Sequence, residues 1–165
     1  MIMLGLGANL PSAVSGPPQA TLAAALDRLA EEGVAILRRS PWYRSAPVPP
    51  GDRPWFVNGV AVVATPLGPP DLLALLHRVE RRFGRVRRAR NESRPLDLDI
   101  LDYDGRIDAG DDGPILPHPR LHERAFVLYP LRDVAPDWHH AISGAGVADL
   151  IAALPPGQCL ERLPE

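Results

Sequence analysis

The chain has 165 residues, a formal net charge of −2 and a hydrophobic fraction of 45%, as expected for one globular domain rather than a disordered protein. All 18 basic residues are arginine, which excludes a lysine-dependent phosphate loop and Schiff-base chemistry. The single Cys159 excludes a disulfide framework and a cysteine-based metal cluster. Because no apolar run is long enough to span a bilayer and the N-terminus lacks a charged leader, we expect a cytoplasmic protein with no membrane contact, forming a single domain over residues 1–165.

The hydrophobic pattern predicts alternating strands and helices along the chain. Strands are expected over residues 2–6, 34–43, 56–63 and 96–103, and helices over 19–30, 70–83, 122–134 and 147–154. The order β-α-β-β-α-β resembles the ferredoxin-like arrangement. We therefore predict an α+β fold, a ferredoxin-like antiparallel sheet flanked by helices on one face, with C-terminal additions.

Charged residues are segregated in the second half of the chain. Eight arginines fall between Arg78 and Arg94, and the next eighteen residues contain seven acids, from Asp97 to Asp112. A basic block directly followed by an acidic block indicates an anion site beside a cation site.

The acidic block begins with two aspartates on one strand. Side chains alternate between the faces of a strand, so Asp97 and Asp99 should share one face while Leu98 and Ile100 point into the core. Two neighbouring carboxylates suit Mg²⁺, which combines one or two of them with substrate phosphates. The alternative is a solvated strand face that carries acids and binds nothing.

The loop before this strand is rich in arginine. Arg85, Arg87, Arg88, Arg90 and Arg94 occur within ten residues, and a guanidinium group binds phosphate through two parallel hydrogen bonds. Arginines beside a magnesium-binding carboxylate pair are typical of phosphoryl transfer, where positioning and charge neutralisation dominate catalysis. A contact with nucleic acid is the rival explanation.

Phe56 and Asn58 lie two residues apart on the expected third strand and should share a face. An amide side chain pairs well with the edge of a heterocycle, and a phenyl ring offers a stacking surface. The alternative for Phe56 is core packing, whereas a buried amide at Asn58 needs a partner.

Several segments together resemble the 6-hydroxymethyl-7,8-dihydropterin pyrophosphokinases of folate biosynthesis, in a match that runs to about Pro136. In chain order the segments are Gly5-Leu6-Gly7-Ala8-Asn9-Leu10, Tyr43-Arg44-Ser45-Ala46-Pro47, Phe56-Val57-Asn58, Gly84-Arg85-Val86-Arg87, Arg94-Pro95-Leu96-Asp97-Leu98-Asp99-Ile100, Leu116-Pro117-His118 and Arg124-Ala125-Phe126. The resemblance implies transfer of the β,γ-pyrophosphoryl group of ATP to the pterin hydroxymethyl oxygen, with release of AMP.

The resemblance also implies roles for individual residues. Asp97 and Asp99 would hold two Mg²⁺ ions, and Arg85 and Arg94 would act on the transferring group. ATP would be bound by His77, Glu80, Arg87, Arg90, Ile100, His118 and Arg124. The pterin would lie between Phe56 and Phe126, with Asn58, Ser45 and Val48 around it. The chain departs from the family where Asn91-Glu92-Ser93 replace the usual Trp-Gly-Pro before Arg94, but no metal ligand is lost.

Two other functions fit parts of the pattern. A metal-dependent nucleotidyltransferase would use the same carboxylate pair but release pyrophosphate instead of AMP. A non-catalytic RNA-binding module is the least favoured reading, because the aromatic pattern of such modules is absent. We therefore expect ATP and the hydroxymethyl pterin as partners, no nucleic acid, and a monomer.

Overall fold

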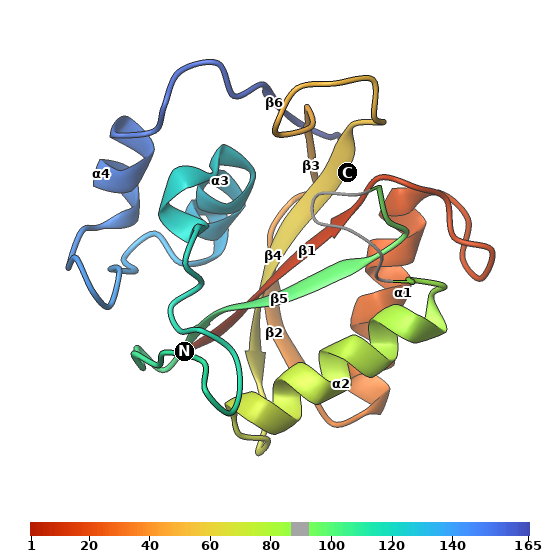
Figure 1. The fold of residues 1–165 in the computed structure, drawn as a ribbon, viewed down its shortest axis with the longest axis horizontal. Helices are drawn as coiled ribbons and strands as arrows, with labels where there is room; N and C mark the ends of the chain where they lie inside the picture. The colour runs from red at the N-terminus through yellow and green to blue at the C-terminus, as the bar shows by residue number, and fades with distance from the viewer. Residues whose placement is uncertain (87–92) are drawn as a thin grey trace.

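The computed structural model describes residues 1–86 and 93–165 and has an α+β fold with a six-stranded antiparallel sheet (Figure 1). The strands are β1 (Ile2–Ala8), β2 (Ala35–Arg39), β3 (Tyr43–Ser45), β4 (Phe56–Ala64), β5 (Asp97–Tyr103) and β6 (Leu160–Arg162). The helices are α1 (Pro18–Glu31), α2 (Pro69–Arg82), α3 (Ala125–Val134) and α4 (Val147–Ala152), with a short 3-10 helix η1 (Leu121–Glu123) before α3.

The sheet is built around β1, which pairs with β4 on one side and β5 on the other. Its strands follow the order β5-β1-β4-β3-β6, and β2 also pairs with β4. The register sets Gly5 opposite Asp99 and Gly7 opposite Asp97, while Gly7 also faces Asn58 on β4. Residues directly opposite each other share a face, so these five residues lie on the same side of the sheet.

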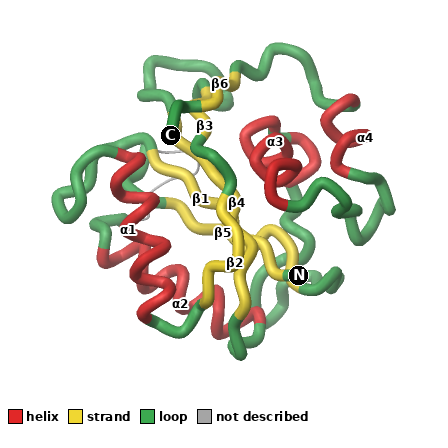
Figure 2. Tube along the Cα trace, turned by 180° about the vertical axis from the view of Figure 1, so that it is seen from behind, coloured by secondary structure: helices red, strands yellow, loops and turns green. Residues whose placement is uncertain are grey.

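The two helices of the β-α-β-β-α-β order, α1 and α2, share one face of the sheet as the ferredoxin-like arrangement predicts, and the C-terminal helices cover the other face (Figure 2). The apolar residues of α1 and α2 pack with Leu4, Leu98 and Ile100 in one core. On the other face, α3 packs over Met3, Val60 and Leu101 in a second core. The C-terminal additions therefore cover the sheet face that the first two helices leave open, and α3 is placed beside the carboxylates of β5.

The strand predicted over residues 34–43 is divided into β2 and β3. The division falls at Pro41, which has no backbone N–H to donate to a neighbouring strand. At the division, the Ser40 N–H donates to the Val60 carbonyl, and the Ser40 hydroxyl accepts a hydrogen bond of 3.0 Å from the Val60 N–H. Trp42 then packs beneath Gly59, where a Cβ would lie 2.5 Å from the indole ring. The break between β2 and β3 is therefore stabilised by the packing of Trp42 in the core.

The two C-terminal helices are shorter than predicted, and the C-terminal part contains one strand that was not predicted. The expected helix over 122–134 begins only at Ala125, because Arg124 is extended, and α4 ends at Ala152. The strand β6 was not predicted and pairs with β3. In the described part of the chain, no helix combines the length and apolar character required to cross a membrane.

Candidate active site

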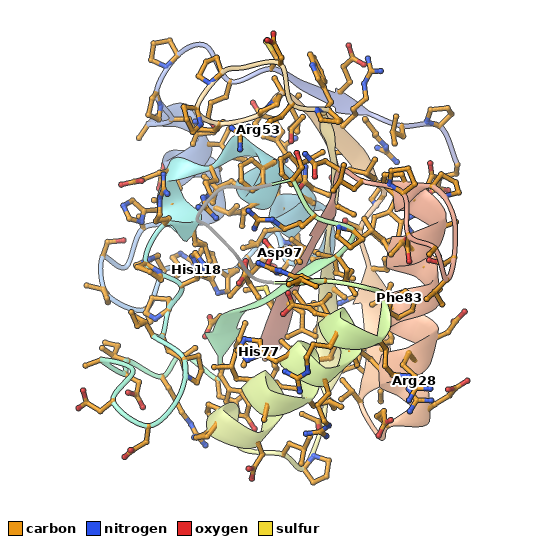
Figure 3. All side chains as sticks on the ribbon, turned by 45° about the vertical axis from the view of Figure 1, so that its right-hand side comes forward. Arg28, Arg53, His77, Phe83, Asp97 and His118 are labelled. Carbon is orange, nitrogen blue, oxygen red and sulfur yellow. The ribbon has the colours of Figure 1, made fainter. Side chains whose placement is uncertain are left out.

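A cavity of about 730 Å³ opens on the sheet face that carries Asp97, Asp99 and Asn58. Its walls come from β1, the loop before β4, the first part of β5, the start of α3 and the C-terminal segment Pro155–Cys159. In Figure 3, Asp97 lies near the middle of the molecule with His118 to its left, whereas Arg28 lies on α1, apart from both. The cavity thus brings together residues from both halves of the chain.

Two glycines of β1, Gly5 and Gly7, lie on the cavity floor. A Cβ on Gly5 would lie 3.2 Å from Leu101 Cδ2, and one on Gly7 would lie 3.1 Å from Asn58 Oδ1. Both distances are tight, so side chains at these positions would crowd the neighbouring residues. The two glycines therefore leave room for the side chains of Leu101 and Asn58 at the cavity floor.

Asp97 accepts hydrogen bonds from two arginines. Its Oδ1 lies 2.5 Å from Nη1 of Arg85, and its Oδ2 lies 3.0 Å from Nη1 of Arg94. Arg85 also forms an ion pair with Glu80, whose side chain is only 1% exposed. Burial alone would lower the pKa of Arg85, but the charges of Asp97 and Glu80 outweigh it and raise that pKa. Arg85 therefore stays charged and ties the end of α2 to the start of β5.

Asp99 differs from Asp97 in its surroundings. Burial, together with the negative charges of Asp97 and Glu80, raises the pKa of Asp99 to about 7. His118 Nε2 lies 4.0 Å from Asp99 Oδ2. This contact is not an ion pair at neutral pH, because burial and the charge of Arg124 lower the pKa of His118 to about 4. A cation bound beside Asp99 would therefore favour the charged form of this carboxyl group and lower its pKa.

The neutral His118 has a defined orientation. Its Nδ1 accepts a hydrogen bond of 3.2 Å from the Arg120 backbone N–H, which assigns the ring proton to Nε2. Arg124, also near this ring, has its pKa lowered by burial and by the charge of Arg120. Positive groups therefore gather on the Asp99 side of the cavity.

The other end of the cavity carries the amide and the aromatic rings. Asn58 is 5% exposed, and its Nδ2 donates a hydrogen bond of 2.7 Å to the Ser45 hydroxyl. Phe56 and Phe126 line the same cavity from β4 and α3. Each ring is accompanied by a guanidinium group, with Arg94 Cζ 5.9 Å from the Phe56 centroid and Arg124 Cζ 5.4 Å from that of Phe126. The aromatic end and the charged end therefore adjoin through Arg94 and Arg124.

Asn9 anchors Arg94 to the neighbouring loops. Its Oδ1 accepts the Arg94 N–H at 2.7 Å, and its Nδ2 donates to the carbonyl of Pro54 and the hydroxyl of Ser93. The Asn9 N–H in turn donates to the Arg94 carbonyl at 3.0 Å. The backbone at Arg94 is thus held from both sides by one buried residue.

The structure brings most of the predicted site residues to the cavity, but not all. Those that line it are Ser45, Val48, Phe56, Asn58, Arg94, Asp97, Asp99, Arg124 and Phe126. Those that do not line it are His77, Glu80, Arg85, Ile100 and His118. Of these, Arg85 and His118 contact the two aspartates, while the Ile100 side chain is buried in the opposite core. Arg87 and Arg90 lie outside the described residues.

Some cavity residues were not assigned a role from the sequence. Arg53 and Arg120 add two guanidinium groups, and Pro155–Cys159 adds a wall. Arg120 lies two residues after His118 in the sequence Pro-His-Pro-Arg, and its closeness to a predicted site residue could have indicated that it lines the cavity. The sequence Pro155-Pro156-Gly157 indicates only a loop, because its pattern does not specify which surface the loop covers.

A carboxylate pair beside several guanidinium groups, next to an amide and two aromatic rings in the same cavity, is the arrangement expected of an enzyme that transfers phosphoryl groups to a flat heterocyclic acceptor. The family model described as 7,8-dihydro-6-hydroxymethylpterin-pyrophosphokinase (HPPK) matches residues 3–136. The chain belongs to this family.

Individual relatives agree with the family model. The 2-amino-4-hydroxy-6-hydroxymethyldihydropteridine pyrophosphokinase of Pseudomonas aeruginosa is 43% identical, over 99% of this chain and 96% of its own length. The enzyme of the same name from Methylorubrum extorquens is 39% identical, over 93% of this chain and 92% of its own.

A solved structure of HPPK-DHPS in complex with substrates has a TM-score of 0.66 at 14% identity. The match covers 92% of this chain but only 42% of that one, and it bears on the fold alone.

The chain is accordingly a pyrophosphokinase of folate biosynthesis, which transfers a pyrophosphoryl group from ATP to hydroxymethyldihydropterin. This assignment favours pyrophosphoryl transfer over the two alternatives, nucleotidyl transfer and RNA binding.

Proposed function

We propose that this transfer takes place in the described cavity, with AMP as the second product and with Mg²⁺ held by Asp97 and Asp99. The observation that carries the proposal is that the carboxylate pair and the amide-lined aromatic slot share one cavity, joined by Arg94 and Arg124. ATP would occupy the charged end and the pterin the aromatic end.

The residues present fit a divalent cation. Asp97 and Asp99 share one face of β5, and burial together with the negative charges of Asp97 and Glu80 raises the pKa of Asp99 in spite of Arg124 and Arg85. No group of three or more His, Cys, Asp or Glu side chains in residues 1–86 and 93–165 could hold a metal. Such a two-carboxylate site suits Mg²⁺, which completes its ligands with water and phosphate oxygens. When bound, two Mg²⁺ ions would neutralise the phosphate charge.

The protein side chains would supply orientation and charge. Arg94 and Arg124 stand between the two ends of the cavity, where guanidinium groups can bind the moving phosphoryl oxygens. Arg85 and Glu80 would keep Asp97 in place, and Arg87, Arg90, His77, His118 and the Ile100 backbone remain proposed ATP contacts. Because phosphoryl transfer depends mainly on positioning and electrostatics, no nucleophilic side chain is required.

The pterin would insert between Phe56 and Phe126. The Asn58 amide, held by Ser45, would pair with the heterocycle edge, and Val48 would close the slot from the loop before β4. Aromatic rings on both sides of a planar heterocycle stabilise it by stacking.

The remaining parts of the proposal concern the whole chain. The order β5-β1-β4-β2 supports a ferredoxin-like description, and residues 1–165 would form a single pyrophosphokinase domain. The monomeric state, the cytoplasmic location and the lack of nucleic-acid binding stay predictions.

Product analysis tests the proposal. With ATP, the hydroxymethyl pterin and Mg²⁺, we expect AMP to accumulate, and only when the metal is present. Asp99→Asn should abolish this activity, whereas Asp111→Asn, at an exposed acid away from the cavity, should not. ADP or free pyrophosphate as the product, or full activity in Asp99→Asn, would contradict the proposal.

A further inference from the structure

We infer that the C-terminal strap, residues 155–159, positions both walls of the pterin slot, and that Gln158 is its positioning residue; this rests on the proposed function. The strap follows α4 and leads into β6 at the edge of the sheet (Figures 1 and 2). All five of its residues line the cavity. The family model ends at residue 136, so the match to that model says nothing about the strap.

Gln158 binds the backbone on either side of Arg124. Its Oε1 accepts a hydrogen bond of 2.8 Å from the Ala125 N–H, and its Nε2 donates one of 2.8 Å to the Glu123 carbonyl. Arg124 between them is extended, with φ −116° and ψ 114°. One amide therefore fixes the chain from which the Arg124 and Phe126 side chains reach the cavity.

The start of α3 depends on this amide. The first N–H groups of a helix have no partner within the helix, and a capping side chain usually accepts from them. Arg124, at the N-cap, makes no such side-chain hydrogen bond, and Gln158 accepts from Ala125 at the first position instead. The orientation of the Phe126 wall is thus set from the C-terminal segment.

The next residue holds the opposite wall. The Cys159 carbonyl accepts a hydrogen bond of 3.2 Å from the Ala46 N–H, at the start of the loop that carries Val48. Leu160 then pairs with Ser45, whose hydroxyl accepts from Asn58. Three consecutive residues, 158–160, therefore connect the Phe126 wall with the Asn58 wall.

Because the strap is bonded to both the Phe126 wall and the Asn58 wall, it sets the width of the slot between these walls. Loss of the Gln158 bonds would leave Arg124 and Phe126 free to shift, while the carboxylates on β5 stay in place. The pterin, which loses a wall of its slot, should be affected more than the nucleotide, which loses the fixed position of Arg124 but keeps Arg94 and the carboxylate site.

Steady-state kinetics of Gln158→Ala, beside the wild type, test this inference. We expect the KM for the pterin to rise about tenfold, as for the loss of two hydrogen bonds of which one is part-buried and one exposed, with the KM for ATP changed less than about threefold. Gln158→Glu keeps the acceptor for Ala125 but loses the donor, so it should have an intermediate KM. Gln19→Ala, at an exposed glutamine on α1, is the matched control and should be unchanged.

The outcomes separate this inference from the proposed function. An active wild type with an unchanged pterin KM in both Gln158 variants would overturn the role of the strap, even if their melting temperatures fell. Equal increases in both KM values would also overturn it, since they would reflect general loosening. No pterin turnover in the wild type would overturn the proposed function and this inference with it.

Discussion

Replacing Asp99 by Asn should stabilise the ligand-free protein at alkaline pH while removing activity. Burial and the charges of Asp97 and Glu80 raise the pKa of Asp99 from 3.8 to about 7. A raised carboxyl pKa means that ionisation disfavours the folded state. The stability contributed by the protonated form is therefore complete below about pH 4, the unfolded pKa, and is lost as pH rises through the folded pKa. Asn cannot ionise, so the variant avoids this loss.

The magnitude follows from the size of the shift and the exposure of the group. A rise from 3.8 to about 7 corresponds to ~4 kcal/mol for a fully buried group. Because 40% of the Asp99 side chain is exposed, solvent screening reduces this to roughly 1–2 kcal/mol. For a domain of this size, the melting temperature of Asp99→Asn should rise by about 2–8 °C near pH 8.

Asp97→Asn provides the matched comparison. This carboxylate binds Arg85 and Arg94, whose side chains are only 8% and 14% exposed, so removing its charge weakens two partly buried ion pairs. We expect a loss of about 1–3 kcal/mol. The strand pattern alone gives the two aspartates the same environment, whereas the structure gives Asp97 two arginine partners and gives Asp99 a raised pKa.

Differential scanning calorimetry of both variants and the wild type, at about pH 4 and about pH 8 without metal, measures the effect. The gain in Asp99→Asn should vanish at the lower pH. A destabilised Asp99→Asn at the higher pH, or a gain that is equal at both values, would refute the electrostatic reasoning.

Other substitutions probe the two ends of the cavity. Asn58→Ala should weaken pterin binding roughly ten- to a hundredfold in titration calorimetry while ATP binding changes little; equal losses would make Asn58 a scaffold residue. Arg94→Lys should lower kcat about tenfold or more with little change in ATP affinity, because lysine keeps the charge but loses the planar fork. The exposed Arg78→Lys should be silent, and a similar effect there would point to general charge loss instead. Gly7→Ala should raise the pterin KM, because the new Cβ would lie 3.1 Å from Asn58 Oδ1, and cost about 1 kcal/mol of stability. An unchanged KM would show that the Asn58 amide does not read the pterin.

Local periodicity predicted which residues share a face. The alternation over Leu96–Ile100 places Leu98 and Ile100 in the core and the two aspartates on the other side, and the structure confirms this. The same rule places Phe56 and Asn58 together. Such predictions succeed because side-chain direction in a strand depends only on the neighbouring residues.

Local periodicity could not predict contacts between segments that are far apart in the sequence. Nothing in the pattern around Glu80 shows that its carboxylate is buried against Arg85 instead of lining the cavity. Nor does a strand of three residues such as β6, next to a Pro-Pro-Gly turn, indicate that it will pair with β3. These features depend on sheet register and on the path of the chain after α4, which no local signal specifies.

The placement of the two substrates in one cavity is tested most directly by a crystal structure of the protein with Mg²⁺, a non-hydrolysable ATP analogue and the hydroxymethyl pterin. We predict metal density at Asp97 and Asp99, phosphates beside Arg94 and Arg124, and the pterin between Phe56 and Phe126 with its edge on Asn58. A pterin bound elsewhere, or a metal that contacts neither aspartate, would contradict the account.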